Sequence, residues 1–76
     1  MENVTLKKAK LKVAIMENDL RTVFTVAKEL GLSMRFICKN ANVNVGNVCS
    51  HLGGRIPMRD ENKQKIYKVV EEVLNV

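Results

Sequence analysis

Four cationic side chains stand in the middle of this 76-residue chain, in a segment without a single acidic residue. No aspartate or glutamate occurs in residues 30–59, whose cationic side chains are Arg35, Lys39, Arg55 and Arg59. The whole chain carries a formal net charge of +5, and most of it arises here. Guanidinium and ammonium groups without competing carboxylates suit the phosphates of a nucleic acid. We therefore predict that these four residues contact phosphate.

The other side chains whose types could do chemistry are Cys38, Cys49 and His51. Together they could supply three zinc ligands, but a structural zinc site needs four and the sequence offers no obvious fourth. Catalysis is not supported either, because the chain has one histidine, no nucleophile–base pair and no glycine-rich phosphate loop. We expect no enzyme activity, no metal and no cofactor. The cysteines are expected to pack as small residues, and His51 to pack or to bond to the backbone.

Composition indicates a small helical domain. Residues 1–76 form one domain whose hydrophobic content of 46% is sufficient for a small core. The core must be mostly aliphatic, since the only aromatic residues are two phenylalanines and one tyrosine, while scarce glycine and proline favour helices. No stretch fits a membrane span or a cleavable secretion signal. We therefore expect a cytoplasmic, nucleoid-associated protein with reduced thiols and no membrane partner.

The first 30 residues have a helical pattern. Apolar residues recur in alternating steps of three and four, which predicts one helical stripe ended by Gly31. Its members are Leu6, Ala9, Val13, Met16, Leu20, Val23, Ala27 and Leu30. Residues 17–19 could divide this helix in two, and residues 8–15, where lysine alternates with apolar residues, also fit a strand. Residues 1–18 are thus a basic N-terminal extension or the start of a long first helix.

Three further helices are predicted, over about residues 34–41, 45–52 and 60–75. Ser33, Asn44 and Asp60 are the expected N-terminal caps. Asn42 is expected in the turn between the first two, because asparagine tolerates a positive φ. The residues expected in the core are Phe36, Ile37, Ala41, Val48, Leu52, Ile66, Val69, Val70, Val73 and Leu74.

Two frames for a helix-turn-helix overlap in this region. One is centred on Gly31 and the other, eleven residues later, on Asn42. The earlier frame puts the polar Asn40 at a core position and leaves the Gly53-Gly54 pair and Pro57 unexplained. We therefore prefer the later frame, in which Gly31 belongs to the link before the motif.

In this frame the chain resembles the lambda-repressor-like helix-turn-helix family, which includes phage repressors, Cro proteins and many antitoxins. The resemblance covers about residues 10–70. It is carried by Leu30-Gly31-Leu32-Ser33, Ile37-Cys38, Val43-Asn44, Val48, Leu52, Gly54, Pro57 and Ile66. It implies a compact all-α domain of four to five helices that binds double-stranded operator DNA as a homodimer, with its third helix in the major groove.

By position, the resemblance implies that four residues read bases: Val45, Gly46, Asn47 and Ser50. The amide of Asn47 suits adenine, Val45 suits a thymine methyl, and Gly46 allows close approach. The implied phosphate contacts add Ser33 and Asn44 to the four cations named above.

The chain departs from the family pattern in three ways. His51 occupies a position that is usually apolar. Met34 stands where glutamine is common, and no helix follows the one expected to end near Asn75. The dimer surface is therefore expected either on residues 6–17 or on the apolar face of residues 69–74.

The sequence thus predicts a sequence-specific transcriptional regulator of phage or plasmid type, a repressor that occludes its operator. An alternative is a protein-interaction module of the same fold, such as an antirepressor or regulatory adaptor, because Val45 and Gly46 make the recognition face weakly polar. A further alternative is a basic first helix lying on an anionic membrane.

Overall fold

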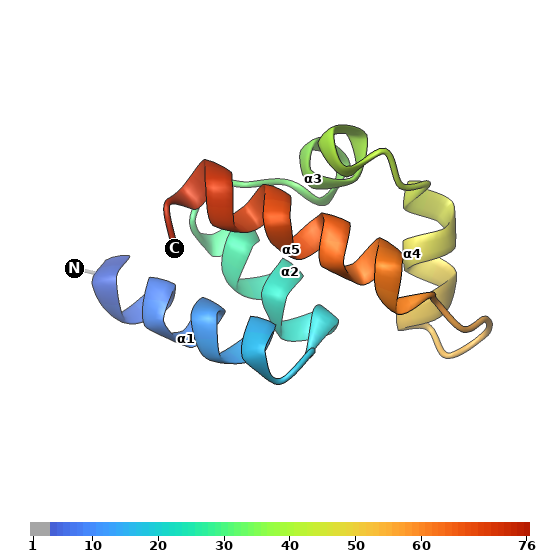
Figure 1. Ribbon diagram of the computed structural model, residues 1–76, viewed down its shortest axis with the longest axis horizontal. Helices are drawn as coiled ribbons and strands as arrows, with labels where there is room; N and C mark the ends of the chain where they lie inside the picture. Colours follow the sequence, from blue (N-terminus) through green and yellow to red (C-terminus); the bar gives the residue numbers. More distant parts are fainter. Residues whose placement is uncertain (1–3) are drawn as a thin grey trace.

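The computed structural model describes residues 4–76, which form five α-helices and no strand (Figure 1). The helices are α1 (Val4–Met16), α2 (Leu20–Glu29), α3 (Met34–Ala41), α4 (Val45–Leu52) and α5 (Asp60–Leu74). The prediction of a small all-α domain of four to five helices is confirmed. The alternative strand over residues 8–15 is wrong, since this segment lies inside α1. Residues 1–3 of the predicted N-terminal extension lie outside the described residues.

A sharp turn separates α1 from α2, so a single long first helix is wrong and the break expected at residues 17–19 is confirmed. Asn18 adopts a left-handed conformation with φ 58°. Asp19 then caps α2, because its carboxylate accepts hydrogen bonds from the backbone N–H of Thr22 at 3.3 Å and from the Thr22 hydroxyl at 2.6 Å. These two bonds hold the pKa of Asp19 below its usual value, the hydroxyl having the larger effect.

The predicted apolar stripe is buried in α2 but not in α1. Its members in α2, including Val23 and Ala27, lie in the core, whereas α1 turns Leu11 and Ala14 inward and leaves Val13 exposed. The reversal of the chain at residues 17–19 is the physical reason. It folds α1 back against α2, so the two helices do not share one continuous face.

The segment α3–turn–α4 has the helix boundaries expected in the later of the two frames. Ser33 caps α3 by accepting a bond from the Phe36 N–H at 3.1 Å, and Asn42 ends α3 in the left-handed region (φ 58°, ψ 44°). Ile37, Cys38 and Ala41 of α3 are buried as predicted. Phe36 is 43% exposed, so its assignment to the core is wrong. α3 is seen almost end-on in Figure 1 while α4 runs along the picture plane, so the two helices cross steeply.

α5 crosses the molecule and closes the core against α3 and α2. Its buried residues are Ile66, Tyr67 and Val70, whereas Val73, also expected in the core, is exposed. The expected cap is wrong as well, because Arg59 occupies the N-cap position and makes no side-chain capping bond. Asp60, one residue later, lies in the first turn, where its negative charge favours the helix dipole.

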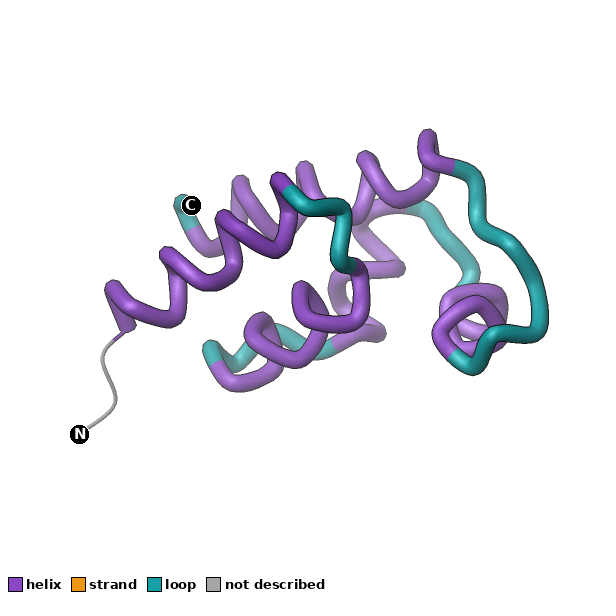
Figure 2. Tube along the Cα trace, turned by 90° about the horizontal axis from the view of Figure 1, so that it is seen from below, coloured by secondary structure: helices purple, strands orange, loops and turns teal. Residues whose placement is uncertain are grey.

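α4 stands apart at one end of an elongated molecule of 37 × 21 × 19 Å, opposite the two chain ends (Figures 1 and 2). The densest helix contacts are those of α1 with α2 and of α3 with α5, and α4 packs mainly on α3. Val48 is the only residue of α4 that is fully buried, with Val45 and Leu52 packed partly against the core. Among residues 4–76 no helix has the length and apolar character needed to cross a membrane.

Tyr67 is buried and donates from its hydroxyl to the side-chain carbonyl of Asn18 at 2.6 Å. Burial, with smaller contributions from the negative charges of Asp19 and Asp60, raises the pKa of Tyr67 to about 12 from the ordinary value of 10.0. The tyrosine is therefore a member of the core and a link from α5 to the turn between α1 and α2.

This shift predicts a loss of stability at alkaline pH. As pH rises, the unfolded chain gives up the Tyr67 proton near pH 10.0, before the folded chain does near about 12. The contribution of this group is therefore complete below pH 10.0 and is lost as pH rises through about 12. Urea unfolding across this range should show a steeper alkaline decline for the parent chain than for Tyr67→Phe. Identical declines would contradict the assignment.

Candidate nucleic-acid interface

The outward face of α4 is small and polar. Gly46 and Asn47 are exposed and Ser50 is half-buried, whereas Val48 is buried on the inner side of the helix. The Asn47 side chain makes no hydrogen bond to any residue between 4 and 76, so both its donor and its acceptor are available to a base edge. The structure thus brings together three of the four predicted base-reading residues.

Val45, the fourth, is placed differently. Its side chain is half-buried and packs against the core. Only the exposed part of the Val45 side chain is open to a thymine methyl. The main role of Val45 is therefore to pack α4 against the rest of the molecule. The sequence does indicate that Val45 faces the core. Val45, Val48 and Leu52 repeat at steps of three and four, which is the spacing of one face of a helix.

Asn44 and Gly46 form one capping unit at the start of α4. The Asn44 side-chain oxygen accepts from the Asn47 N–H at 3.1 Å. A Cβ added at Gly46 would lie 3.0 Å from that same oxygen, so a larger residue would crowd the cap. Gly46 is therefore explained by local packing as well as by the close approach predicted from sequence. The Asn44 amide nitrogen stays available for the predicted phosphate contact.

All six predicted phosphate-contacting residues are exposed. They do not meet in one place. Ser33 and Arg35 line one hollow, Lys39 and Asn44 line a second of about 430 Å³ at the α3–α4 turn, and the remaining two lie between α4 and α5. These two are Arg55 and Arg59. The six residues thus surround the helix-turn-helix on several sides.

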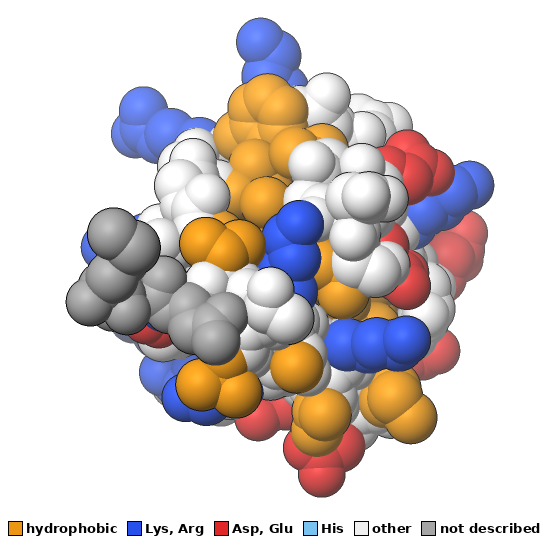
Figure 3. All heavy atoms as spheres, turned by 90° about the vertical axis from the view of Figure 1, so that its left-hand side faces the viewer, with side chains coloured by type: hydrophobic (Ala, Val, Ile, Leu, Met, Phe, Trp, Pro, Cys, Tyr) orange, Lys and Arg blue, Asp and Glu red, His pale blue; other side chains and the backbone are white. Residues whose placement is uncertain are grey.

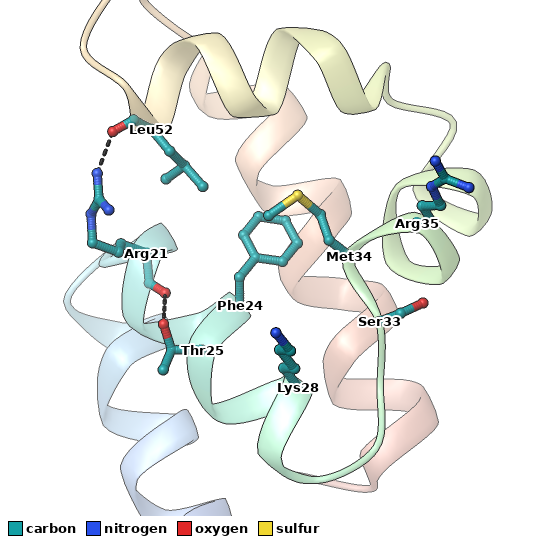
Figure 4. Close-up of a pocket in the computed structure, with 8 residues that line it drawn as sticks. All are labelled: Arg21, Phe24, Thr25, Lys28, Ser33, Met34, Arg35 and Leu52. Carbon is teal, nitrogen blue, oxygen red and sulfur yellow. Dashed lines mark hydrogen bonds between the residues drawn. The ribbon is translucent and has the colours of Figure 1, made fainter.

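The first hollow contains two cations that were not predicted from the sequence. It has a volume of about 390 Å³ and lies between α2, the start of α3 and the end of α4 (Figure 4). Arg21 and Lys28 of α2 join Arg35 of α3 around a floor of Phe24, Met34 and Leu52, with Thr25 and Ser33 completing the lining. Among residues 4–76 no acidic side chain lines it. In Figure 4 the ammonium of Lys28 points into the hollow and Arg35 stands at its far side.

The sequence contains a pattern that indicates one wall of this hollow. Arg21, Thr25 and Lys28 follow a helical repeat of four and three, so they share the α2 face that carries no apolar stripe. What the sequence did not show is that this face lies beside the N-terminus of α3. There, unpaired backbone N–H groups and the positive end of the helix dipole add to the three side-chain charges.

Arg21 also connects α2 to α4, because its guanidinium donates to the backbone carbonyl of Leu52 at the end of α4 (Figure 4). A carbonyl in the last turn of a helix has no partner within the helix, and the helix dipole is negative there. Arg21 therefore satisfies an open acceptor with a favourable charge and fixes the far end of α4 relative to α2.

Cys38, Cys49 and His51 have three different environments. Cys38 is buried as predicted, and burial, with a smaller effect of neighbouring Cys49, raises the pKa of its thiol. Cys49 is exposed, so its predicted packing between the helices is wrong; its sulfur lies 3.9 Å from that of Met34. His51 donates from Nδ1 to the Ile56 carbonyl at 3.0 Å, as expected for a backbone-bonded histidine. Residues 4–76 contain no group of three His, Cys, Asp or Glu able to hold a metal.

Comparison with protein-family models, with curated proteins and with solved structures finds no match to this chain. Function must therefore be inferred from the geometry of the chain itself. The described acidic residues all lie in or beside α1, α2 and α5, and one of them, Glu29, pairs with Lys7 at 3.7 Å. α3, α4 and the turn between them contain no carboxylate, whereas α5 begins with Asp60 and Glu61 directly after Arg59.

Proposed function

We propose that this protein is a sequence-specific, double-stranded DNA-binding regulator of the lambda-repressor-like kind, and that it represses transcription by occluding an operator. The observation that carries the proposal is a protruding helix, α4, with a polar outward face. Together with α3 it forms a helix-turn-helix that contains no carboxylate and carries or borders several cations. An α-helix fits the major groove of B-DNA, and cations on both sides of it can hold the two phosphate backbones.

In this mechanism α4 enters the major groove with its first turn toward the bases. The Asn47 amide would donate to and accept from adenine, and Ser50 would bond to a neighbouring base edge. Lys28 and Arg35, in the hollow beside the N-terminus of α3, would neutralise phosphates on one side, and Lys39 on the other. Base contacts would supply the selectivity and phosphate contacts most of the salt-dependent affinity.

The finer parts of the proposal follow from the same resemblance. We expect a homodimer on an inverted repeat, because two-fold symmetric dimers read palindromic sites. A phage- or plasmid-type repressor would act in the cytoplasm, at the nucleoid.

A second candidate function is a protein-interaction module of the same fold that does not bind DNA. The observation in its favour is that two large apolar side chains are exposed, Phe36 and Ile56. Phe36 lies in α3, before α4 in the sequence, and Ile56 follows α4. Exposed apolar side chains of this size suit a protein partner more than a phosphate backbone. Such a complex would be insensitive to salt, whereas a DNA complex would not.

Selection of random duplexes with the purified chain, at low and at moderate salt, separates the two. An enriched inverted repeat with salt-dependent affinity would establish an operator-binding regulator. Salt-dependent binding without an enriched sequence would leave a nonspecific DNA-binding protein and contradict the proposed specificity. No recovery at either salt concentration would favour the protein-interaction module, to be tested by capture of a partner protein at high salt.

Replacing Asn47 by Ala should lower affinity for the selected site while leaving affinity for random duplex nearly unchanged. A bidentate amide–adenine contact contributes about 1–3 kcal/mol of discrimination, which corresponds to a loss of roughly 5- to 150-fold on the selected site alone. Gln64→Ala is the matched control, since it removes an exposed amide from α5. Equal losses on selected and random duplexes would remove Asn47 from the base-reading set.

A further inference from the structure

The hollow between α2, the start of α3 and the end of α4 has an apolar floor and a cationic rim. Its floor consists of the Phe24 ring, the half-buried Met34 and Leu52, and its volume is about 390 Å³. In Figure 4 the Phe24 ring and the Met34 side chain lie at the centre of the hollow, with Lys28 and Arg35 around them. Small-molecule sites have volumes of roughly 300–1,000 Å³. The hollow is therefore large enough for a compact organic molecule.

Most polar groups of the lining are already used by the fold. The Thr25 hydroxyl donates to the Arg21 carbonyl at 2.9 Å, and the Ser33 hydroxyl accepts from the Phe36 N–H at 3.1 Å. The Arg21 guanidinium donates to the Leu52 carbonyl. Thr25 and Ser33 therefore stabilise their own helices, and Arg21 is fixed as a positive charge at the edge of the hollow.

Lys28 and Arg35 are the polar side chains of the hollow that the fold does not use. Both are exposed, and neither side chain makes a hydrogen bond or an ion pair to any residue between 4 and 76. No carboxylate among the described residues lines the hollow to neutralise them. A guanidinium can bind both oxygens of a carboxylate or phosphate, and an ammonium adds a point charge. The two free cations thus suit an anionic group.

The floor and the cations together select an anion with an apolar body. An inorganic ion would pair with the cations but leave the apolar floor in water, and an uncharged molecule would leave the cations unpaired. An aromatic ring suits this floor, because it can pack on the Phe24 ring and contact the Met34 sulfur. We propose that the hollow is a binding site for a small aromatic anion. Its carboxylate or phosphate lies between Lys28 and Arg35.

Other parts of the described surface carry charges of both signs. At the end of the molecule where the two chain ends lie, Lys and Arg side chains are interspersed with Asp and Glu side chains around the apolar patches (Figure 3). A second hollow, of about 370 Å³ where α1 meets α2, is lined by Lys10, Glu17 and Asp19. An anion at either place meets carboxylates as well as cations. The hollow beside α3 is therefore the place where an organic anion should bind first.

The bound anion acts as an effector of DNA binding. It neutralises Lys28 and Arg35, the two cations that would otherwise meet DNA phosphates on this side. It also packs against α4, because Leu52 belongs to α4 and the Met34 sulfur lies 3.9 Å from that of Cys49. The effector therefore lowers the affinity for DNA, and DNA lowers the affinity for the effector by the same factor. This regulatory role rests on the proposed function, whereas binding of the anion does not.

Titration of the full chain with naphthoate at low salt, followed by the amide chemical shifts in NMR spectra, tests the site. Naphthoate should cause saturable shifts centred on the backbone N–H groups of residues 24–28 and 33–36. Acetate and inorganic phosphate lack the ring, and naphthalenemethanol lacks the charge, so each should bind about tenfold more weakly or worse. Naphthyl phosphate belongs to the same series. Its binding more tightly than naphthoate would assign the anionic group to a phosphate, and the reverse order to a carboxylate.

Variants separate the roles of the cations and the floor. Lys28→Ala combined with Arg35→Ala should weaken naphthoate binding by about tenfold or more. Lys65→Ala with Lys68→Ala changes the net charge equally at exposed positions of α5 outside the hollow, and should leave naphthoate binding unchanged. Met34→Gln keeps both cations but makes the floor polar, so it should also weaken binding. Circular dichroism should show that every variant keeps the helical fold, since none of these positions is fully buried.

Several results would overturn the proposal. They are naphthoate shifts that do not saturate or that lie away from the hollow, equal affinities for acetate and naphthoate, and an equal loss of binding in the control pair on α5.

The effector role is measured separately, with a labelled duplex. Saturating naphthoate should weaken DNA binding by the parent chain about tenfold relative to the same concentration of acetate, and should not weaken it further in the Lys28→Ala, Arg35→Ala chain. Unchanged DNA affinity in the parent chain would overturn the effector role. A chain that binds DNA but not naphthoate would overturn the site alone. A chain that binds naphthoate but not DNA would support the site and contradict the proposed function.

Discussion

A chain carrying both Lys28→Glu and Arg35→Glu should bind duplex DNA about a hundredfold more weakly than the parent, whatever the sequence of the duplex. Both cations line the acid-free hollow at the N-terminus of α3. Each reversal removes one phosphate-binding cation and places a carboxylate near the backbone of the DNA. If the two residues are instead replaced by Ala, the slope of log affinity against log salt should flatten by about 0.9 for each phosphate that is no longer neutralised.

The matched control for this experiment is Lys65→Glu with Lys68→Glu. Both lysines are exposed on α5 and neither lines the hollow, yet the net charge changes by the same amount. Fluorescence anisotropy with a labelled duplex at several salt concentrations measures both pairs. A decrease of equal size in the control pair would mean that only the overall charge of the protein matters. The hollow would then have no specific part in binding.

Asn18→Ala should destabilise the fold by about 2–4 kcal/mol, a large fraction of the stability of a small domain. Asn18 holds a left-handed backbone conformation that alanine adopts only with strain. Its side chain accepts from the buried Tyr67 hydroxyl at 2.6 Å and donates to the Asp60 carboxylate at 3.3 Å. The substitution would remove both bonds and leave the Tyr67 hydroxyl without a partner. Urea unfolding followed by circular dichroism measures the decrease in stability.

Two further variants divide this effect between backbone and side chain. Asn18→Gly tolerates the left-handed conformation, so it should recover the backbone part of the stability and leave the side-chain part missing. Combining it with Tyr67→Phe removes the hydroxyl that would be left unsatisfied, so the two decreases in stability should be less than additive. Full additivity would contradict a direct contribution of the Tyr67–Asn18 bond. An Asn18→Gly chain as stable as the parent would assign the whole effect to the backbone.

The proposed site was predictable from the sequence only in part. The start of α4 was predicted because Asn44, its N-cap, has a strong capping preference, and the outward positions of Gly46 and Asn47 were implied by the family resemblance. The hollow with Arg21 and Lys28 was not predicted, because its residues come from α2, α3 and α4 and depend on how these helices pack. The interpretation of Cys49 as a packed residue is wrong for a related reason, since α4 docks on the rest of the molecule through few residues.

Local sequence is sufficient to specify α3, α4 and most of α5. Their bounds depend on interactions between residues no more than a few positions apart, such as the Ser33 and Asn44 caps and the left-handed turn at Asn42. The buried face of α1, in contrast, depends on tertiary packing. The apolar residues of α1 lie on more than one side, so its pattern does not select a face, and the reversal at Asn18 sets which side meets α2. Tyr67, 49 positions from Asn18, completes that reversal by a bond that no local pattern in the sequence could predict.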